Sequence, residues 1–125
     1  MPRYVESTEQ LVVELFVRDL RRSLAYYRAL GFAVLRQEET FAVVAWEEHR
    51  LFLDRRDDLP DPPASPVVNV RVMLPDVDRV WRLVNELGLR VVAPIDNRYY
   101  GLRDFTVADP DGFGVRFATR LPAED

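Results

Sequence analysis

The residues best suited to chemistry are three charged side chains, Glu14, Arg71 and Arg116. Strand parity places each of them on the face of its strand opposite the one that carries the alternating apolar core residues. Glu14 and Arg71 are 71 − 14 = 57 residues apart, the separation that also relates two similar segments of the chain. A carboxylate can act as a general acid or base, and a guanidinium can hold an anionic group. The alternative is an ion pair between Glu14 and Arg71 that only satisfies two charges.

Aromatic side chains accompany these charges. Phe16 and Phe52 share their predicted strand face, and Tyr99 and Tyr100 lie in a loop from which they could stack on a flat ligand. The only histidine, His49, lies beside two glutamates in a predicted turn, where no residue orients it for catalysis. The predicted ligand-binding residues are Glu14, Phe16, Phe52, Asn69, Arg71, Tyr99, Tyr100 and Arg116, with Glu14 also the candidate for catalysis.

Missing residue types exclude several chemistries. The 125 residues include no cysteine and no lysine, which excludes disulfides, thiolate metal sites, cysteine nucleophiles and Schiff-base lysines. The net charge of −4, with basic residues spread along the chain, argues against nucleic acid as a partner. The chain has no apolar run of membrane-spanning length, and its start, MPRYVESTEQ, lacks a secretory pattern, so we expect a cytoplasmic protein without a membrane partner.

An internal repeat positions the candidate residues. Residues 12–35 align without gaps over residues 69–92, pairing Asp19 with Asp76 and Gly31 with Gly88. In each copy an alternating apolar strand leads to an aspartate suited to cap a helix, and a glycine follows that helix. An apolar stripe marks the second helix at Val77, Val80, Trp81, Val84 and Leu87, and the first helix spans about 20–30 with Leu20, Leu24, Tyr27 and Leu30.

Short strands follow each helix. They are predicted at 32–37, 40–46 and 50–54, and again at 89–94, 102–108 and 113–119. Asp109 and Asp111, in the sequence DPDG, are predicted to form the turn before the last strand. The chain is therefore predicted to be α+β, with two tandem βαβββ modules. We expect one domain, 1–125, of modules at about 10–54 and 67–120 that share a core, joined by the proline-rich linker 55–66.

The paired modules, together with YYGLRDFTVADPDG before the final strand, resemble the glyoxalase/bleomycin resistance/dioxygenase superfamily, also called vicinal oxygen chelate proteins. The resemblance implies that the two modules form a curved mixed sheet around a concave cavity. Metalloenzymes of that family hold a divalent ion at four equivalent positions. The matching residues here are Val12, Phe52, Asn69 and Arg116. None offers a carboxylate or an imidazole, so the sequence predicts no metal and no other cofactor, and disfavours glyoxalase and dioxygenase activity.

The resemblance then points to the metal-free bleomycin-resistance-like branch. Tyr100, Gly101, Arg103, Asp104 and Phe105 match its aromatic-Gly-x-Arg/Glu-aromatic stretch. Such proteins sequester a planar cationic drug in clefts of a homodimer, which implies small-molecule binding, antibiotic or toxin resistance and a homodimer here. Arg71 and Arg116 add positive charge that suits a cation poorly.

Two alternatives remain open at this point. One is a metal-independent isomerase or lyase that uses Glu14 with Arg71 or Arg116. The other is an interaction domain whose concave face is vestigial. Whether the protein is an enzyme is therefore left undecided, with binding favoured over catalysis.

Overall fold

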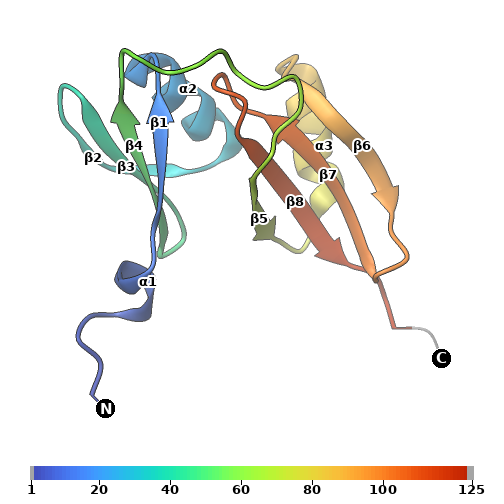
Figure 1. Ribbon diagram of the computed structural model, residues 1–125. Helices are drawn as coiled ribbons and strands as arrows, with labels where there is room; N and C mark the ends of the chain where they lie inside the picture. The colour runs from blue at the N-terminus through green and yellow to red at the C-terminus, as the bar shows by residue number, and fades with distance from the viewer. Residues whose placement is uncertain (1, 124–125) are drawn as a thin grey trace. The chain divides into compact units, whose positions relative to one another are not determined.

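Two sets of strands and helices repeat along the chain in the computed structural model, which describes residues 2–123 (Figure 1). Residues 1–61 and 62–125 form two compact units, and the boundary falls inside the proline-rich segment 55–66. The first unit contains α1 (Ser7–Gln10), β1 (Val13–Val17), α2 (Leu20–Leu30), β2 (Ala33–Gln37), β3 (Phe41–Trp46) and β4 (His49–Arg55). The second contains β5 (Asn69–Met73), α3 (Val77–Glu86), β6 (Val91–Asn97), β7 (Leu102–Ala108) and β8 (Gly114–Arg120).

Each unit has its own four-stranded mixed sheet, in the orders β1-β4-β3-β2 and β5-β8-β7-β6. The opening strand pairs in parallel with the closing strand, while the remaining pairs are antiparallel. The predicted α+β class and the tandem βαβββ modules are confirmed. The shared core, the concave cavity and the single domain of modules 10–54 and 67–120 stay predictions.

Register confirms that the two modules are equivalent. Glu14 lies opposite Phe52 in β1–β4, and Arg71 lies opposite Arg116 in β5–β8. The opening strands therefore match at an offset of 71 − 14 = 57 and the closing strands at 116 − 52 = 64. The second module inserts 64 − 57 = 7 residues between them, and its β6–β7 turn carries Tyr99 and Tyr100.

Both helices begin and end in the same way. Asp19 and Asp76 accept hydrogen bonds from the backbone N–H groups of Arg22 and Arg79, as predicted for N-caps. At the C-termini, the N–H of Phe32 donates to the carbonyl of Tyr27, and the N–H of Leu89 donates to that of Val84. Because Leu89 still belongs to this helix ending, β6 begins at Val91 rather than at the predicted residue 89.

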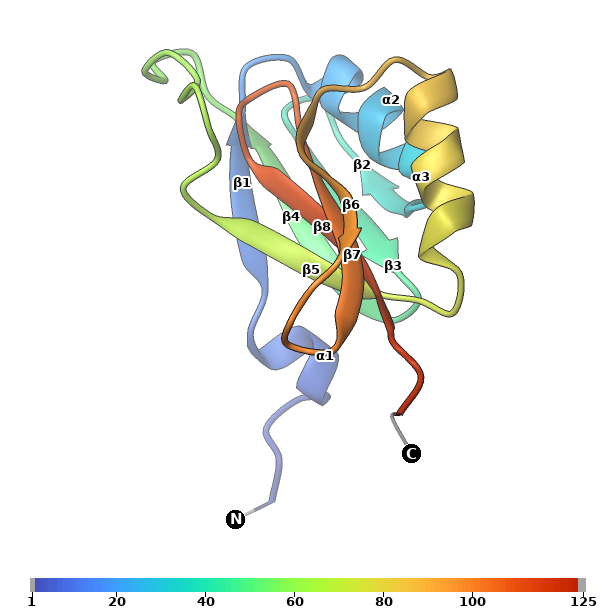
Figure 2. The same ribbon diagram turned by 90° about the vertical axis from the view of Figure 1, so that its right-hand side faces the viewer.

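One helix packs on one face of each sheet. In the first unit, buried Tyr27 packs edge-on against Phe32, which in turn contacts Trp46 of β3. In the second unit, Trp81 of α3 packs on Phe105 of β7. Figure 2 shows α3 running alongside the sheet of this unit. The opposite sheet faces are therefore left for other contacts.

The short helix α1 was not predicted, because a single turn is too short to show a helical period.

Among residues 2–123, no helix combines the length and apolar character that crossing a bilayer would require.

The turn between β7 and β8 depends on one buried carboxylate. Asp109 Oδ1 accepts hydrogen bonds from the backbone N–H groups of Asp111, at 2.8 Å, and Phe113, at 2.9 Å. Gly112 has a φ of 87°, and an added Cβ would lie 2.7 Å from Cδ of Pro63. The predicted turn role of Asp109 is confirmed, and the proline-rich segment packs on this turn.

We expect Asp109→Ala to lower the free energy of unfolding by about 2 kcal/mol, because two backbone N–H groups lose their acceptor. Urea denaturation followed by tryptophan fluorescence, to which Trp81 of the same unit contributes, measures this change. Asp58→Ala, at an exposed aspartate, is the control and should leave the urea concentration at the unfolding midpoint unchanged. Equal midpoints for the two variants would contradict the assigned role of Asp109.

Candidate functional site

The face of the second sheet turned away from α3 carries a buried carboxylate. On β7 and β8, Phe105 lies opposite Phe117 and both belong to the core beneath Trp81. Side chains alternate along a strand, so Asp104 and Arg116 project from the other face. The Asp104 side chain is only 4% exposed. A carboxylate this deeply covered needs several donors to remain charged.

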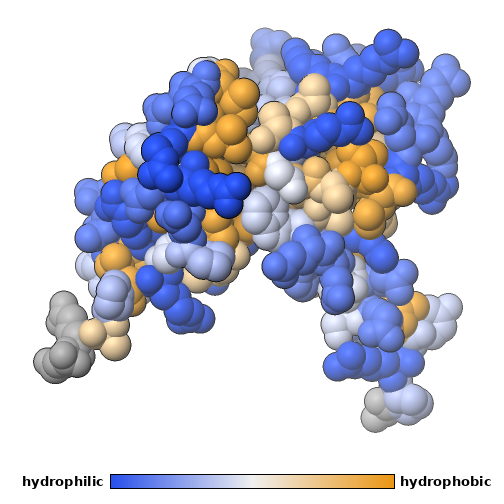
Figure 3. Space-filling model, turned by 180° about the vertical axis from the view of Figure 1, so that it is seen from behind, coloured by the Kyte–Doolittle hydropathy of each residue, from blue (hydrophilic) through white to orange (hydrophobic). Residues whose placement is uncertain are grey.

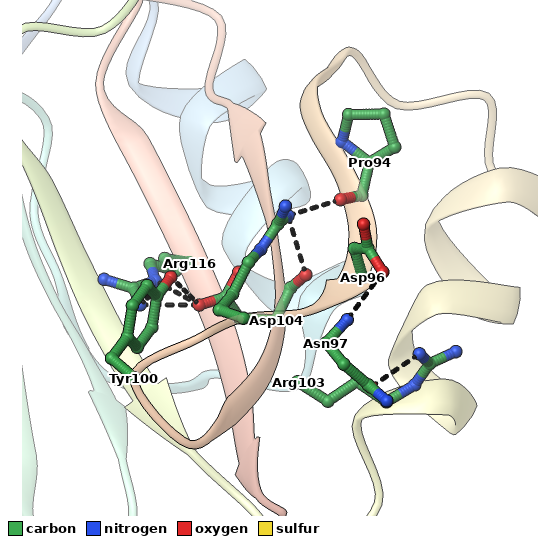
Figure 4. Close-up of polar contacts among 8 residues, drawn as sticks. Pro94, Asp96, Asn97, Tyr100, Arg103, Asp104 and Arg116 are labelled. Carbon is green, nitrogen blue, oxygen red and sulfur yellow. Dashed lines mark hydrogen bonds and ion pairs between the residues drawn. The ribbon is translucent and has the colours of Figure 1, made fainter.

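Three side chains supply those donors (Figure 4). Asp104 accepts hydrogen bonds from Arg98 Nε at 2.8 Å, Tyr100 Oη at 2.7 Å and Arg116 Nε at 3.0 Å. Arg116 Nη2 also donates to Tyr100 Oη at 2.8 Å, and its guanidinium lies 5.2 Å from the centre of the Tyr100 ring. Asp104, Arg98, Tyr100 and Arg116 are called the Asp104 cluster below.

The cluster carries more positive than negative charge. Burial raises the pKa of the Asp104 carboxyl, but hydrogen bonds from Tyr100, Arg98 and Arg116 outweigh burial, so the pKa lies below its ordinary value. The hydrogen bond to Asp104, with burial, raises the pKa of the Tyr100 phenol, which therefore stays protonated as a donor. One carboxylate thus stands against two guanidiniums.

Arg98 anchors the cluster to the edge strand. Its Nη2 donates to the carbonyl oxygen of Pro94, at 2.6 Å. Pro94 has no backbone N–H, which is tolerated because β6 is an edge strand.

A separate ion pair on the helix side of the sheet joins Arg103 to Asp78 at 3.0 Å, and Arg103 also donates to Asn97. Hydrogen bonding to Arg103 is the main cause that lowers the pKa of the Asp78 carboxyl.

The predicted ligand-binding residues divide between the two units. In the second unit, Asn69 and Arg71 on β5 and Arg116 on β8 belong to the same sheet face, and Tyr100 reaches that face from the turn. Tyr99 instead projects into solvent and touches Tyr100 edge-on. A surface hollow lies at the C-terminal ends of β5 and β8 and does not include Arg116. It is lined by Met73, Leu74, Pro75, Thr119 and Arg120.

In the first unit, Glu14 and Phe52 are neighbours across β1–β4, and Phe16 lies two residues along the same face. Phe52 packs edge-on against Phe41, and the Arg56 guanidinium lies 4.4 Å from the centre of the Phe16 ring. Glu14 is exposed and receives no hydrogen bond from residues 2–123. Glu14 and Arg71 lie in different units, so their pairing stays a prediction.

Sequence reasoning did not identify Asp104 and Arg98 as site residues. Thr106 pairs with Arg116 and Asp104 with Ala118, so Asp104 and Arg116 are diagonal neighbours on adjacent strands. That signal was present, because the predicted hairpin around residues 109–112 brings an acidic and a basic residue of the same face close together. Arg98 had no comparable signal, since it reaches Asp104 from the β6–β7 turn.

Divalent metal ligands are not available at the four family positions. Val12, Phe52 and Asn69 provide no anionic or imidazole ligand, and Arg116 places a cation at the fourth position, held there by Asp104. Asp104 itself already accepts from three side chains. Within the described residues, no group of three histidine, cysteine or acidic side chains is arranged to hold a metal ion.

Comparison with known proteins agrees with this architecture. Residues 10–117 match the Glyoxalase/Bleomycin resistance protein/Dioxygenase superfamily. The chain belongs to this superfamily. The resemblance inferred from the repeat is therefore confirmed, and curated bleomycin resistance proteins are among its relatives. Those of Geobacillus stearothermophilus and Staphylococcus aureus are each 26% identical over 128 residues, covering 90% of this chain and 97% of the relative.

Solved structures show the same fold. A bleomycin resistance determinant encoded on the transposon Tn5 superposes with a TM-score of 0.73 at 22% identity, covering 90% of this chain and 98% of that one. A bleomycin-binding protein in complex with bleomycin gives 0.72 at 22% identity, with the same coverage. TioX from Micromonospora sp. ML1 gives 0.72 at 25% identity, covering 89% of this chain and 98% of its own.

We expect Asp104→Asn to lower the free energy of unfolding by about 2 to 3 kcal/mol at neutral pH, because it removes the charge between two guanidiniums. The depressed pKa means that Asp104 stabilises the fold above about pH 4, the ordinary aspartate value, and that this stabilisation is lost as pH falls through the folded-state pKa. Denaturation of wild type and variant at several pH values should therefore give curves that converge in acid.

Asp96→Asn is the matched control, because Asp96 lies opposite Asp104 on β6 but is exposed. It should retain near-wild-type stability. A wild-type advantage over Asp104→Asn that stayed constant down to pH 2 would contradict the depressed pKa.

Proposed function

We propose that this protein binds a small organic molecule without a metal ion and sequesters it without changing it chemically. The observation that carries the proposal is Arg116, a cation fixed by Asp104 at a position where metalloenzymes of the superfamily hold a metal ligand. Relatives named bleomycin resistance proteins support a role in binding a drug or toxin. Antibiotic resistance is the physiological role that fits such sequestration.

The sheet faces turned away from the helices are the proposed binding surfaces. In the first unit this face presents Glu14, Phe16 and Phe52, and in the second it presents Asn69, Arg71, Tyr100 and Arg116, with Tyr99 beside it. Aromatic rings supply apolar contact area and the charges fix the orientation of a bound ligand. The exposed Glu14 has no orienting partner in its unit, so geometry gives the isomerase or lyase alternative less support than binding.

Binding without metal is tested by titrating the protein with a panel of planar compounds that includes bleomycin, with and without EDTA. We expect at least one compound to raise the melting temperature equally in both conditions, and Zn²⁺, Ni²⁺ or Mn²⁺ alone to have no effect. Mass spectrometry should recover the bound compound unaltered. Loss of binding in EDTA, or a converted compound, would contradict the proposal.

Phe52→Ala should weaken that binding by about tenfold or more, because it removes an aromatic contact on the proposed face. Tyr4→Ala removes an aromatic ring that is 94% exposed, outside the proposed faces, and serves as the control.

We also propose a homodimer. Figure 3 shows hydrophobic residues interspersed with hydrophilic ones on the surface of each unit. Large apolar side chains stay exposed near the two opening strands, among them Leu11 at 89%, Val13 at 41% and Val67 at 88%. Association with a second copy would remove such groups from water.

Sedimentation equilibrium at micromolar concentration should therefore give about twice the chain mass of 14.6 kDa. Val67→Asp, which replaces one of these apolar side chains with a charge, should shift the protein toward the monomer. A wild-type protein that sediments at 14.6 kDa would contradict the dimer.

A further inference from the structure

Two arginines lie side by side on the face of the second sheet. Arg71 of β5 is the register partner of Arg116 of β8, and the two strands run parallel. Their neighbours along the strands, Val72 and Phe117, are buried on the helix side, so both guanidiniums belong to the opposite face. Like charges directly opposite each other in a sheet are destabilising. Such a pair is retained more readily if an anion is bound between them.

Only one of the two arginines is neutralised within its unit. Arg116 shares Asp104 with Arg98, and the Asp104 carboxylate already accepts from three side chains. Arg71 is exposed and forms no hydrogen bond or ion pair with residues 2–123. Neither β5 nor β8 contains an acidic residue, and Asp96 lies on β6, the strand farthest from β5. Positive charge is therefore in excess at the β5–β8 pair.

Arg116 is also prepared for a ligand. Asp104 and Tyr100 hold its guanidinium in place, and about a quarter of its side chain stays exposed. A guanidinium fixed in this way loses little conformational freedom when it binds. Arg71 is unrestrained and can close on the same group from the neighbouring strand. Arg71 offers a planar donor fork that matches the oxygens of a carboxylate or phosphate. Arg116 already donates from Nε and Nη2 to Asp104, so its Nη1 is the donor left for a ligand.

We propose that the β5–β8 face binds an oxyanion, a carboxylate or phosphate, carried by the small-molecule ligand, with Arg71 and Arg116 as its two cationic contacts. This inference rests on the proposed binding function and specifies the charge of the ligand. It separates this protein from a receptor for a cationic drug, because a cation on this face would meet two guanidiniums. Tyr100 beside Arg116 places an aromatic ring next to the bound anion.

The test compares four probes that share one aromatic ring system. They are 2-naphthoate, 2-naphthyl phosphate, neutral 2-naphthamide and cationic 2-naphthylmethylamine, titrated by calorimetry into wild-type protein in EDTA. We expect at least one anion to bind about tenfold or more tightly than the amide and the amine, and raised salt to weaken only the anions. This comparison needs no variant and so does not depend on how a substitution affects folding.

Arg71→Gln should reduce the affinity for the anion by about tenfold or more and leave that for the amide unchanged. Arg79→Gln removes the same charge from an exposed position on α3 and is the matched control. The amide or the amine binding as tightly as both anions would overturn this inference and leave the proposed binding function standing. Equal affinity of Arg71→Gln and Arg79→Gln for the anion would also overturn the oxyanion inference. Arg71-dependent anion binding that is lost in EDTA, or that ends in conversion of the probe, would support this inference and overturn the proposed function.

Discussion

The organisation of the second sheet face depends on one buried carboxylate. Asp104 is almost fully covered, yet its pKa lies below the ordinary value because three side chains donate to it. Those donors come from the β6–β7 turn, which holds Arg98 and Tyr100, and from β8, which holds Arg116, so one aspartate joins two segments that are separate in sequence. Removing Asp104 would leave two guanidiniums without their counter-charge, which makes the cluster act as a unit.

The same cluster occupies one of the positions that the family resemblance assigns to metal ligands. Arg116 stands at that position, and its guanidinium is held by the Asp104 carboxylate. The result is a face with fixed hydrogen-bond donors and excess positive charge. A site of this kind can recognise an anionic group through preset geometry and needs no ion to do so.

Repetition in the chain produced two modules with the same framework and different faces. Aspartate caps, helix endings and parallel pairing of opening with closing strands agree between the modules. The faces differ. Glu14 and Phe52 occupy the register positions that Arg71 and Arg116 occupy in the second module. Caps and core contacts are constrained by folding, whereas the open faces are free to vary and can acquire binding functions.

The sequence by itself determined the class of fold, the repeat and the framework of each module. Apolar periodicity, the caps Asp19 and Asp76, and the turn around Asp109 are local signals, and each was interpreted correctly because its physical cause lies within a few residues. Strand parity also correctly placed Arg71 and Arg116 on one face. Only the tertiary structure decided which charges meet. Arg98 reaches Asp104 from the β6–β7 turn, and Tyr100 folds onto Arg116 while the adjacent Tyr99 stays in solvent. Loop conformation and side-chain direction set these contacts, and neither follows from a repeating pattern, because each is chosen by the combined packing of segments distant in sequence.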